Sequence, residues 1–305
     1  IEMSNIIHIT KADDLSISNN QLVMIDEDDN NKVDRISLND IMAIVIENCK
    51  CRITGVLQVK LAENNIPLII CNEKYHPTAY SLGLYNHFQI TARINEQIKW
   101  EETRKEEIWS EIVCRKIEHQ KDLLEFLEKD RVSINRLTNY IENTRTNRSD
   151  AEHQEAIASR VYFQELFGNQ FRRFDSDGIN SALNYGYMVL RTLISSKIVS
   201  KGFHPSLGIH HKSQFNSYNL SDDIIEVFRP LVDFVVYYNQ EKELKLTKEL
   251  RQILLLALKQ KVYWKDRKYD LPLAVDYFID NIRNAFIDKN VEIEIPKLRI
   301  MDYEY

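Results

Sequence analysis

The hydrophobic pattern of this 305-residue chain changes its period near residue 80, and this change limits the folds that the chain can adopt. Before that point, short apolar runs, for example at 21–25 and 42–46, are separated by turns rich in Asp and Asn, which is typical of β-strands. From residue 91 onward, apolar residues recur at helical spacing. The sequence therefore predicts an α+β protein: a small N-terminal β domain (with one helix, at 54–64) joined by a connector to a larger all-α C-terminal domain.

The predicted boundaries follow the same change of period. We expect a β-rich domain at 1–80, a connector at 81–90, a helical domain at 91–290 and a C-terminal tail at 291–305. A chain of this length can bury two separate cores. Within the helical domain, the apolar periodicity predicts helices at 155–167, 177–200, 221–238, 246–258 and 272–287.

The composition, 44% hydrophobic and 28% charged, is ordinary for a globular protein. No apolar run approaches the roughly 20 residues that a membrane span needs, and the start of the chain lacks the pattern of a signal peptide, so we expect a cytoplasmic protein that does not enter a membrane. The cysteines have no zinc-type spacing, and we expect all of them to be small core residues in a reducing compartment. They are Cys49, Cys51, Cys71 and Cys114.

Several enzyme classes are excluded by what the sequence lacks. The chain has only seven glycines and no glycine loop that could cradle a phosphate, which argues against Walker-type and dinucleotide-binding enzymes. It also lacks a serine-hydrolase elbow. The net charge of −6 does not by itself favour a nucleic-acid partner, although the local distribution of charge decides that question.

The strongest functional signal is a split constellation of Glu155, His211 and Glu226 in the second half of the chain. Two carboxylates and one imidazole, on helices that can converge, suit a hard divalent cation that acts on phosphodiesters. Asp223 lies three residues before Glu226, so both carboxylates lie on one face of the predicted helix. On spacing alone, the stronger alternative is that these two acids cap the start of that helix, whose N-cap we place at Ser221 or Asp222.

Two members of this constellation have neighbours that could take their place. Glu152 could act instead of Glu155, because the sequence does not rank the two; an ordinary exposed glutamate in a first helical turn is the plainer alternative. His204 and His210 cluster with His211 just before the paired acids. A histidine cluster in this place is better than a lone histidine as a metal-site signal.

Basic residues supply weaker candidates for contacts with a phosphate backbone. One group surrounds Tyr263 and Trp264, as in a strip that binds single strands with interleaved aromatic rings, although a solvated loop between two helices explains it equally well. A second group could contact phosphates near the metal. The candidates are Lys259, Lys261, Lys265, Arg267 and Lys268 in the first group, and Arg145, Arg148, Arg160, Arg172 and Arg173 in the second.

Taken together, the sequence resembles the CRISPR-associated spacer-acquisition integrase and endonuclease, the larger of the two universal adaptation proteins, and most closely its type II-A branch. The resemblance covers nearly the whole chain. It is carried by Glu155-Ala156, Arg160-Val161-Tyr162-Phe163, Leu166-Phe167-Gly168-Asn169, Asp177, Ile179-Asn180, Leu183-Asn184-Tyr185-Gly186-Tyr187, Leu207-Gly208-Ile209, His211, Gln214-Phe215-Asn216, Asn219-Leu220, Asp223 and Glu226-Val227-Phe228-Arg229-Pro230.

This resemblance implies a metal-dependent DNA endonuclease and integrase of CRISPR adaptation. It implies that Glu155, His211 and Glu226 are both the catalytic residues and the ligands of Mg²⁺ or Mn²⁺, with Asp223 as a candidate additional ligand. The enzyme would insert short foreign DNA fragments into the repeat array by attack of a 3′-hydroxyl on a phosphodiester.

The implied partners are double-stranded DNA, as the fragment and as the CRISPR leader and repeat, and a second copy of the chain bound through the β domain. They also include the smaller adaptation protein in a heterohexamer-like complex, other type II-A adaptation proteins and the effector nuclease. Two alternatives stay open: a non-catalytic assembly scaffold, and a transposon-borne integrase of the same fold.

Overall fold

The N-terminal part of the chain forms two four-stranded sheets and one helix. The computed structural model describes residues 5–11, 14–26, 32–83, 87–240 and 244–299. The strand order is β1-β5-β7-β8 in one sheet and β4-β3-β2-β6 in the other. The bounds are β1 Asn5–Ile9, β2 Asp14–Ser18, β3 Gln21–Asp26, β4 Lys32–Ser37, β5 Ile41–Ile46, β6 Arg52–Ile53, α1 Gly55–Glu63, β7 Leu68–Cys71 and β8 Pro77–Ser81, with a short 3₁₀ turn at Leu38–Asp40.

Strand β5 connects this part to the rest of the molecule. All six of its residues are buried, and it pairs in parallel with β1 and β7. Ile44 and Ile46 pack into a core shared with Leu57 of α1, whereas Val45 belongs to the core of the helical part. A strand covered on both faces needs a continuous apolar run, which is why this segment lacks the alternation of its neighbours.

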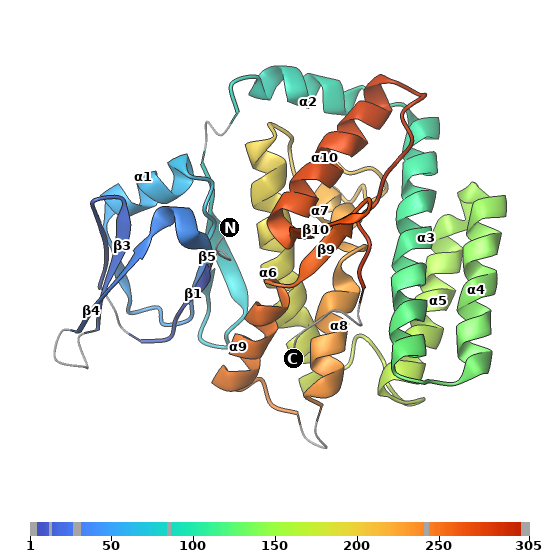
Figure 1. Ribbon diagram of the computed structural model, residues 1–305, viewed down its shortest axis with the longest axis horizontal. Helices are drawn as coiled ribbons and strands as arrows, with labels where there is room; N and C mark the ends of the chain where they lie inside the picture. Colours follow the sequence, from blue (N-terminus) through green and yellow to red (C-terminus); the bar gives the residue numbers. More distant parts are fainter. Residues whose placement is uncertain (1–4, 12–13, 27–31, 84–86, 241–243, 300–305) are drawn as a thin grey trace.

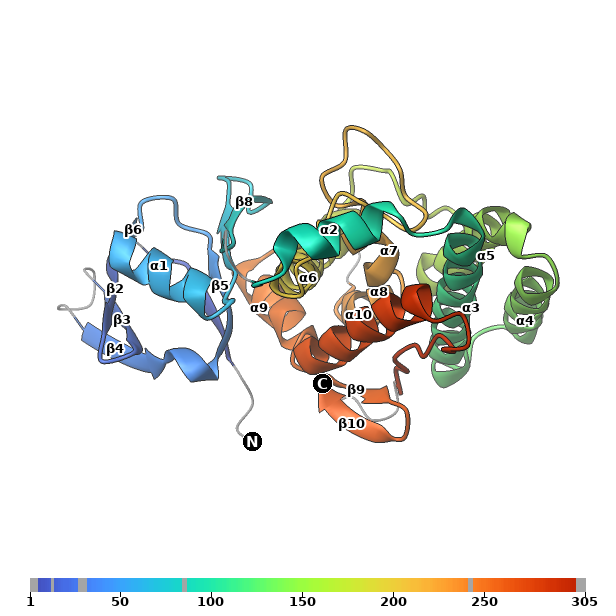
Figure 2. The same cartoon turned by 90° about the horizontal axis from the view of Figure 1, so that it is seen from above.

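The remainder of the chain is mostly helical, as expected, but a two-stranded antiparallel ribbon interrupts it. The prediction of an all-α domain is therefore wrong at 261–270. The elements are α2 Ile90–Ile98, α3 Glu102–Phe126, α4 Arg131–Thr146, a 3₁₀ turn at Arg148–Asp150, α5 Ala151–Phe167, α6 Gly178–Ser200, α7 Asn219–Ile225, α8 Arg229–Tyr238, α9 Lys248–Ala257, β9 Lys261–Trp264, β10 Arg267–Asp270 and α10 Leu271–Ile287. Figures 1 and 2 show the sheets at one end of the molecule and α3, α4 and α5 at the other, with α6 and α8–α10 between them.

The helix predicted at 221–238 is two helices, and Pro230 explains the break. A proline lacks the backbone N–H and its ring clashes with the carbonyl four residues earlier, which here belongs to Glu226. Helix α7 accordingly ends at Ile225, and α8 begins at Arg229 with the proline in its first turn. The predicted N-cap at Ser221 or Asp222 is also wrong, because α7 already begins at Asn219.

A buried polar cluster joins the β-rich part to the helical part. Arg251 of α9 donates to Glu47, which follows β5, from Nε at 2.6 Å and from Nη2 at 2.8 Å. The hydroxyl of Tyr185 donates to the same carboxylate at 3.0 Å, and Nε2 of His8 lies 2.9 Å from it. Burial acts to raise the pKa of Glu47, but hydrogen bonds from His8 and Arg251 outweigh it and hold that pKa at about 2.

The described part of the C-terminal tail packs against α3 and the ribbon. The backbone N–H of Leu298 donates to Nε2 of His119 at 3.0 Å, while Nδ1 of His119 lies 2.9 Å from the carbonyl of Val227. Lys297 forms an antiparallel bridge with Tyr263 of β9. One buried imidazole thus joins the tail to the residue that follows Glu226. The last six predicted tail residues, 300–305, lie outside the described residues.

Two expectations from composition have different outcomes. The four cysteines form no disulfide, and Cys71 and Cys114 are buried as expected. Cys49 is exposed and Cys51 is half-buried, so the prediction that all four are core residues is wrong for these two, which lie in the turn between β5 and β6. Within the described ranges, no helix has both the length and the apolar content needed to cross a membrane.

Candidate active site

Asp223 organises the loop that carries His211. Its fully buried carboxylate accepts three backbone N–H groups, from Ile209 at 2.5 Å and from His210 and His211 at 3.1 Å each. The same carboxylate lies 2.7 Å from Nδ1 of the His211 ring. Because the carboxylate can only accept, Nδ1 carries the proton, and Nε2 is the ring nitrogen left to accept or to bind a metal. Burial acts to lower the pKa of His211, but its hydrogen bond to Asp223 outweighs this and raises the pKa.

The loop is held at both ends by residues of α7. The amide of Asn219 donates to the carbonyls of Ser206 and Ser213, at 2.9 and 3.0 Å. Gly208 passes so close to the carboxylate that a Cβ atom there would lie 2.9 Å from Oδ2 of Asp223. Glycine is therefore required for the close approach of this backbone to the carboxylate.

The two predicted glutamates meet at one buried lysine. Lys116 of α3 donates to Oε1 of Glu155 on α5, and its Nζ lies 2.5 Å from Oε2 of Glu226. The side chains of Lys116 and Glu226 are each 6% exposed, and that of Glu155 is 22% exposed. Nε of Arg229 donates to the other oxygen of Glu226 at 2.9 Å. Both carboxylates are therefore within reach of a single cation.

The charges of this cluster outweigh the effect of burial on its pKa values. Burial acts to raise the pKa of Glu226, but Arg229 and Lys116 lower it to about 2. Burial acts to lower the pKa of Lys116, yet Glu155 and Glu226 raise it. Lys116 and Glu226 are consequently both charged at neutral pH.

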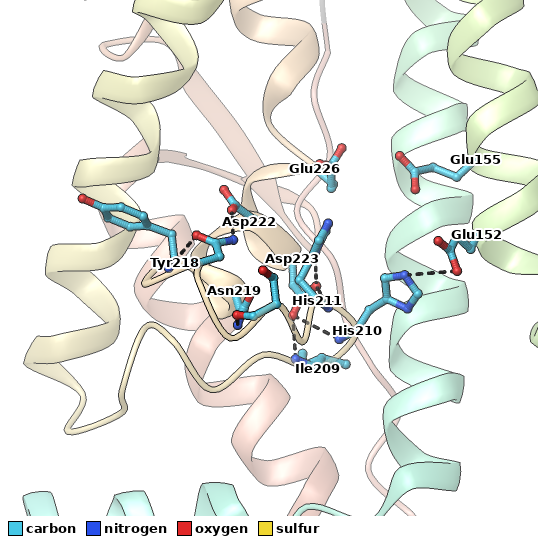
Figure 3. A network of polar contacts seen from close by, with 12 residues as sticks. Glu152, Glu155, Ile209, His210, His211, Tyr218, Asn219, Asp222, Asp223 and Glu226 are labelled. Carbon is cyan, nitrogen blue, oxygen red and sulfur yellow. Dashed lines mark hydrogen bonds and ion pairs between the residues drawn. The ribbon is translucent and has the colours of Figure 1, made fainter. Parts of the chain in front are cut away.

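His211 lies beside the acid pair. Figure 3 shows the carboxylate of Glu155 directed toward the side where Glu226 lies, and the ring of His211 between Glu226 and Asp223. In the part of the chain that the structure describes, no three His, Cys, Asp or Glu side chains are already close enough to hold a metal ion. The three groups nevertheless fit a divalent cation: Oε2 of Glu226 is buried and already faces a positive charge, the ammonium of Lys116, and Nε2 of His211 is the ring nitrogen left to coordinate.

The geometry also distinguishes the alternatives that the sequence left open. The side chain of Glu152 is 77% exposed and its carboxylate lies 3.8 Å from Nε2 of His210, whereas the carboxylate of Glu155 contacts Lys116. The His210 ring is stacked on Trp109, with the ring centroids 4.2 Å apart. His204 contacts the hydroxyl of Ser206 instead. Asp223 and Glu226 do not cap the start of a helix, because the first accepts amides from a loop and the second directly follows α7 and pairs with Lys116 and Arg229.

Sequence reasoning missed Lys116, although a signal was present. Helical spacing places this lysine on the same face as Ile112 and Val113, both fully buried, and next to Ile117. A lysine on an apolar stripe must be paired when it is buried. The pattern could have identified Lys116 as a buried cation, but not its partners.

A second buried network supports the acid pair from behind. Asp233 of α8 accepts hydrogen bonds from the hydroxyls of Tyr162 on α5, at 2.9 Å, and of Tyr187 on α6. The guanidinium of Arg229 lies over the ring of Tyr187, 4.5 Å from its centroid. Burial raises the pKa of Asp233 to about 6. This network fixes α5 and α8, which carry Glu155 and Arg229, against α6.

Three of the predicted basic residues share a groove with Glu155. Arg160, Arg172 and Arg173 line a groove of about 1150 Å³ that also includes Glu155 and the almost fully exposed Phe174. Cations and aromatic rings in one groove are what a bound nucleic-acid strand requires.

Arg145 and Arg148 are instead paired with acids of α3. Arg145 donates to Glu118 at 2.6 Å, and Arg148 lies 3.3 Å from Glu107. Both arginine side chains are about half exposed. Exposed pairs of this kind contribute little to stability, so these arginines remain available to a phosphate at small cost.

The other basic group surrounds the β9–β10 ribbon rather than a loop between helices. The turn between the two strands contains Lys265, with a positive φ of 54°. Lys259 donates to Asn5 of β1 at 3.1 Å. The remaining members are Lys261 and Arg267, both exposed, and Lys268, which lies over the ring of Tyr263.

Comparison with known proteins identifies the family of the chain. Residues 7–257 match the model of the family described as CRISPR associated protein Cas1. The chain is 31% identical over 296 residues to the CRISPR-associated endonuclease Cas1 of Neisseria meningitidis, and the match covers 95% of each chain.

Solved structures show that the fold is shared. A casposase bound to its integration product superimposes with a TM-score of 0.76 at 17% identity, covering 99% of this chain and 95% of that one. A Cas6-RT-Cas1–Cas2 complex gives a TM-score of 0.72 at 19% identity, covering 96% of this chain but only 36% of that longer chain. At these identities the likeness concerns the fold alone.

Proposed function

The chain belongs to the Cas1 family of CRISPR-associated proteins, and from this premise we propose how its site acts on DNA. The family makes it a nuclease and integrase enzyme of CRISPR adaptation. We propose that it inserts short foreign DNA fragments into the repeat array, where the 3′-hydroxyl of a fragment attacks a phosphodiester. Glu155, His211 and Glu226 would be the residues that carry this reaction.

One observation carries the assignment of the site: Glu155 on α5 and Glu226, which directly follows α7, meet at a single buried cation beside a histidine of fixed orientation. Buried carboxylates are costly unless they are paired, so two of them at one point indicate a place where positive charge is bound. In this arrangement Asp223 acts as a positioning residue rather than as a ligand, because the three amides and the imidazole already occupy its oxygens.

We propose that the cofactor is Mg²⁺ or Mn²⁺, held by the two glutamates and by Nε2 of His211. When bound, the metal would polarise the scissile phosphate and stabilise charge on the attacking and leaving oxygens. A ligand set of mixed carboxylates and imidazole favours Mn²⁺ somewhat over Mg²⁺. The protein's own part is to hold three ligands in position and to orient the imidazole through Asp223.

The substrate would reach the site along the groove that contains Arg160, Arg172 and Arg173. These arginines can bind phosphate oxygens, and the exposed ring of Phe174 can stack on a base. Because Glu155 lines the same groove, a strand bound there would end beside the acid pair.

The proposed partners follow from the family. They are double-stranded DNA, a second copy of this chain joined through the β-rich part, and the smaller adaptation protein. The solved complex that contains both Cas1 and Cas2 supports a Cas2-type partner. The assignment to the type II-A branch, with its further adaptation proteins and effector nuclease, stays a prediction.

The decisive test is strand transfer into a supercoiled plasmid that carries a leader and a repeat, with Mn²⁺ or EDTA and with or without the small partner. His211→Ala, Glu155→Gln and Glu226→Gln should each abolish joining and leave DNA binding largely intact. His210→Ala is the matched control, since its neighbouring ring is stacked on Trp109, and it should still join DNA. Folded protein that joins no DNA under any condition would favour the assembly scaffold instead.

The genomic neighbourhood separates the remaining alternative, a transposon-borne integrase. An adjacent repeat array and adaptation genes would support the CRISPR role, whereas terminal inverted repeats around the gene would support the transposon role.

A further inference from the structure

The ammonium of Lys116 stands where a divalent cation would bind. It contacts both Glu155 and Glu226, and its side chain is almost completely buried. The two carboxylates are the very oxygens that the proposed metal site would use. A lysine ammonium and a metal ion cannot both occupy the space between them.

The energetics of buried charge give this lysine a role. Without a cation, the buried carboxylate of Glu226 and the largely buried carboxylate of Glu155 would repel each other more strongly than they would in water. Of the two acids, Arg229 pairs with Glu226, on its other oxygen, and therefore does not bridge the pair. Lys116 is the group that neutralises both acids at once.

We propose that Lys116 is an internal counter-ion that keeps the acid pair assembled in the metal-free protein and is displaced when a divalent cation binds. The lysine side chain is suited to this role, since a compact charge on a flexible four-carbon stem can move without any change in the backbone of α3. Its way out leads toward the groove, because Glu155 is the more exposed of the two acids and lines that groove.

A displaced buried ammonium needs another anion. On the groove side, that anion is a phosphate of bound DNA, and this step rests on the proposed function. Metal and DNA would then help each other to bind: DNA stabilises the displaced lysine, and the displaced lysine leaves the carboxylates to the metal. Such a coupling is reciprocal by thermodynamic necessity.

The experiment is a titration with Mn²⁺, followed by the electron paramagnetic resonance signal of free Mn²⁺, with and without a short DNA duplex. Lys116→Met should bind Mn²⁺ about tenfold or more tightly than the wild type without DNA, a size typical of coupled sites. DNA should tighten Mn²⁺ binding to the wild type but not to Lys116→Met. Lys116→Arg retains the charge and should bind Mn²⁺ as weakly as the wild type.

Lys121→Met is the matched control, because Lys121 lies on the same helix and pairs with the neighbouring Asp122 rather than with the two glutamates. Lys121→Met should leave the Mn²⁺ affinity unchanged, both with and without the DNA duplex. Equal Mn²⁺ affinity in Lys116→Met and the wild type would overturn the proposal.

Thermal melting covers the case in which Lys116→Met does not fold alone. A variant that is unfolded in EDTA but folded in Mn²⁺ would support the proposal, because the metal then replaces the lysine. A variant that is unfolded in both would overturn it.

Glu155→Gln and Glu226→Gln separate this proposal from the proposed function. If they bind Mn²⁺ as well as the wild type does, the metal site itself is wrong. If both glutamine variants no longer bind Mn²⁺ while Lys116→Met binds it with the same affinity as the wild type, only the proposed role of the lysine is wrong.

Discussion

Nδ1 of His211 lies 2.7 Å from Oδ1 of Asp223, and the carboxylate that fixes the ring also collects the backbone amides of 209–211. The imidazole is thus oriented by the same group that shapes its loop. A ring that is free to rotate would present Nε2 to the acid pair only part of the time.

Asp223→Asn should weaken the site without abolishing it. The new amide nitrogen would replace an oxygen and so leave an N–H of the loop without an acceptor, at a cost of about 1–3 kcal/mol in the free energy of unfolding. Loss of a group that orients a metal ligand typically lowers metal affinity about 10–100-fold. Urea unfolding and Mn²⁺ titration measure the two effects. Asp222→Asn, at a neighbouring residue with other partners, should change Mn²⁺ affinity little, and an equal effect there would argue against a special role for Asp223.

Arg160→Ala combined with Arg172→Ala should weaken DNA binding and make it less sensitive to salt. Each lost phosphate contact lowers the slope of log K against log salt by about 0.9, so the double variant should lose nearly two units of slope. Lys265→Ala with Arg267→Ala, on the ribbon, should leave the slope unchanged. Fluorescence anisotropy at several salt concentrations measures the DNA affinity of both double variants. If only the ribbon variant binds DNA more weakly and with a smaller slope, the DNA contacts the ribbon rather than the groove.

Arg251→Met should destabilise the protein strongly, because it leaves Glu47 charged and buried without its main partner. Breaking one side of a buried ion pair costs about 3–5 kcal/mol. Arg283→Met is the matched control: this arginine pairs with Glu96 where both side chains are partly exposed, and its loss should cost less than about 1 kcal/mol. Chemical denaturation of both variants tests the difference. Adding Glu47→Gln to Arg251→Met should recover part of the lost stability. A further decrease in stability would show that the carboxylate of Glu47 stabilises the folded protein even without Arg251.

His119 should make the folded state less stable in acid. Burial holds the pKa of His119 at about 3 in the folded protein, whereas an unfolded histidine titrates near pH 6.5. Between these two values only the unfolded chain takes up the proton, so stability falls by about 1.4 kcal/mol for each pH unit below 6.5 through this group. His119→Gln should remove this part of the slope between pH 6 and 4, which urea unfolding at a series of pH values measures. An unchanged slope would show that His119 is not the group responsible.

Much of the fold was predictable because the chain's periodicity is local. The apolar run of β5, the period of α6 and the capped start of α1 at Thr54 all depend on residues within a few positions of one another. Pro230 indicates the break between α7 and α8 in the sequence, but the apolar spacing continues across it and by itself predicts a single helix. The ribbon was missed because two four-residue strands carry almost no periodic signal.

The sequence names the candidate ligands Glu155, His211 and Glu226 but not the residues that surround them. Glu155, His211 and Glu226 were identified through strings that resemble a family, whereas spacing alone favoured a capping role for the paired acids. The bridging role of Lys116 could not be inferred, because it depends on contacts across 39 residues to Glu155 and 110 (226 minus 116) to Glu226. Such contacts exist only after α3, α5 and α7 have packed together.

That difference in sequence separation has a consequence for how the protein folds. The pair of His211 and Asp223 closes a loop of twelve residues, which costs little chain entropy and can form as soon as α7 does. The bridge from Lys116 to Glu226 closes a loop about nine times longer and must wait for three helices to assemble. The histidine half of the site should therefore form early in folding, and the acid half should be the first to separate when the helices come apart. Amide exchange at 209–211 that persists after α3 has lost its protection would show this order directly.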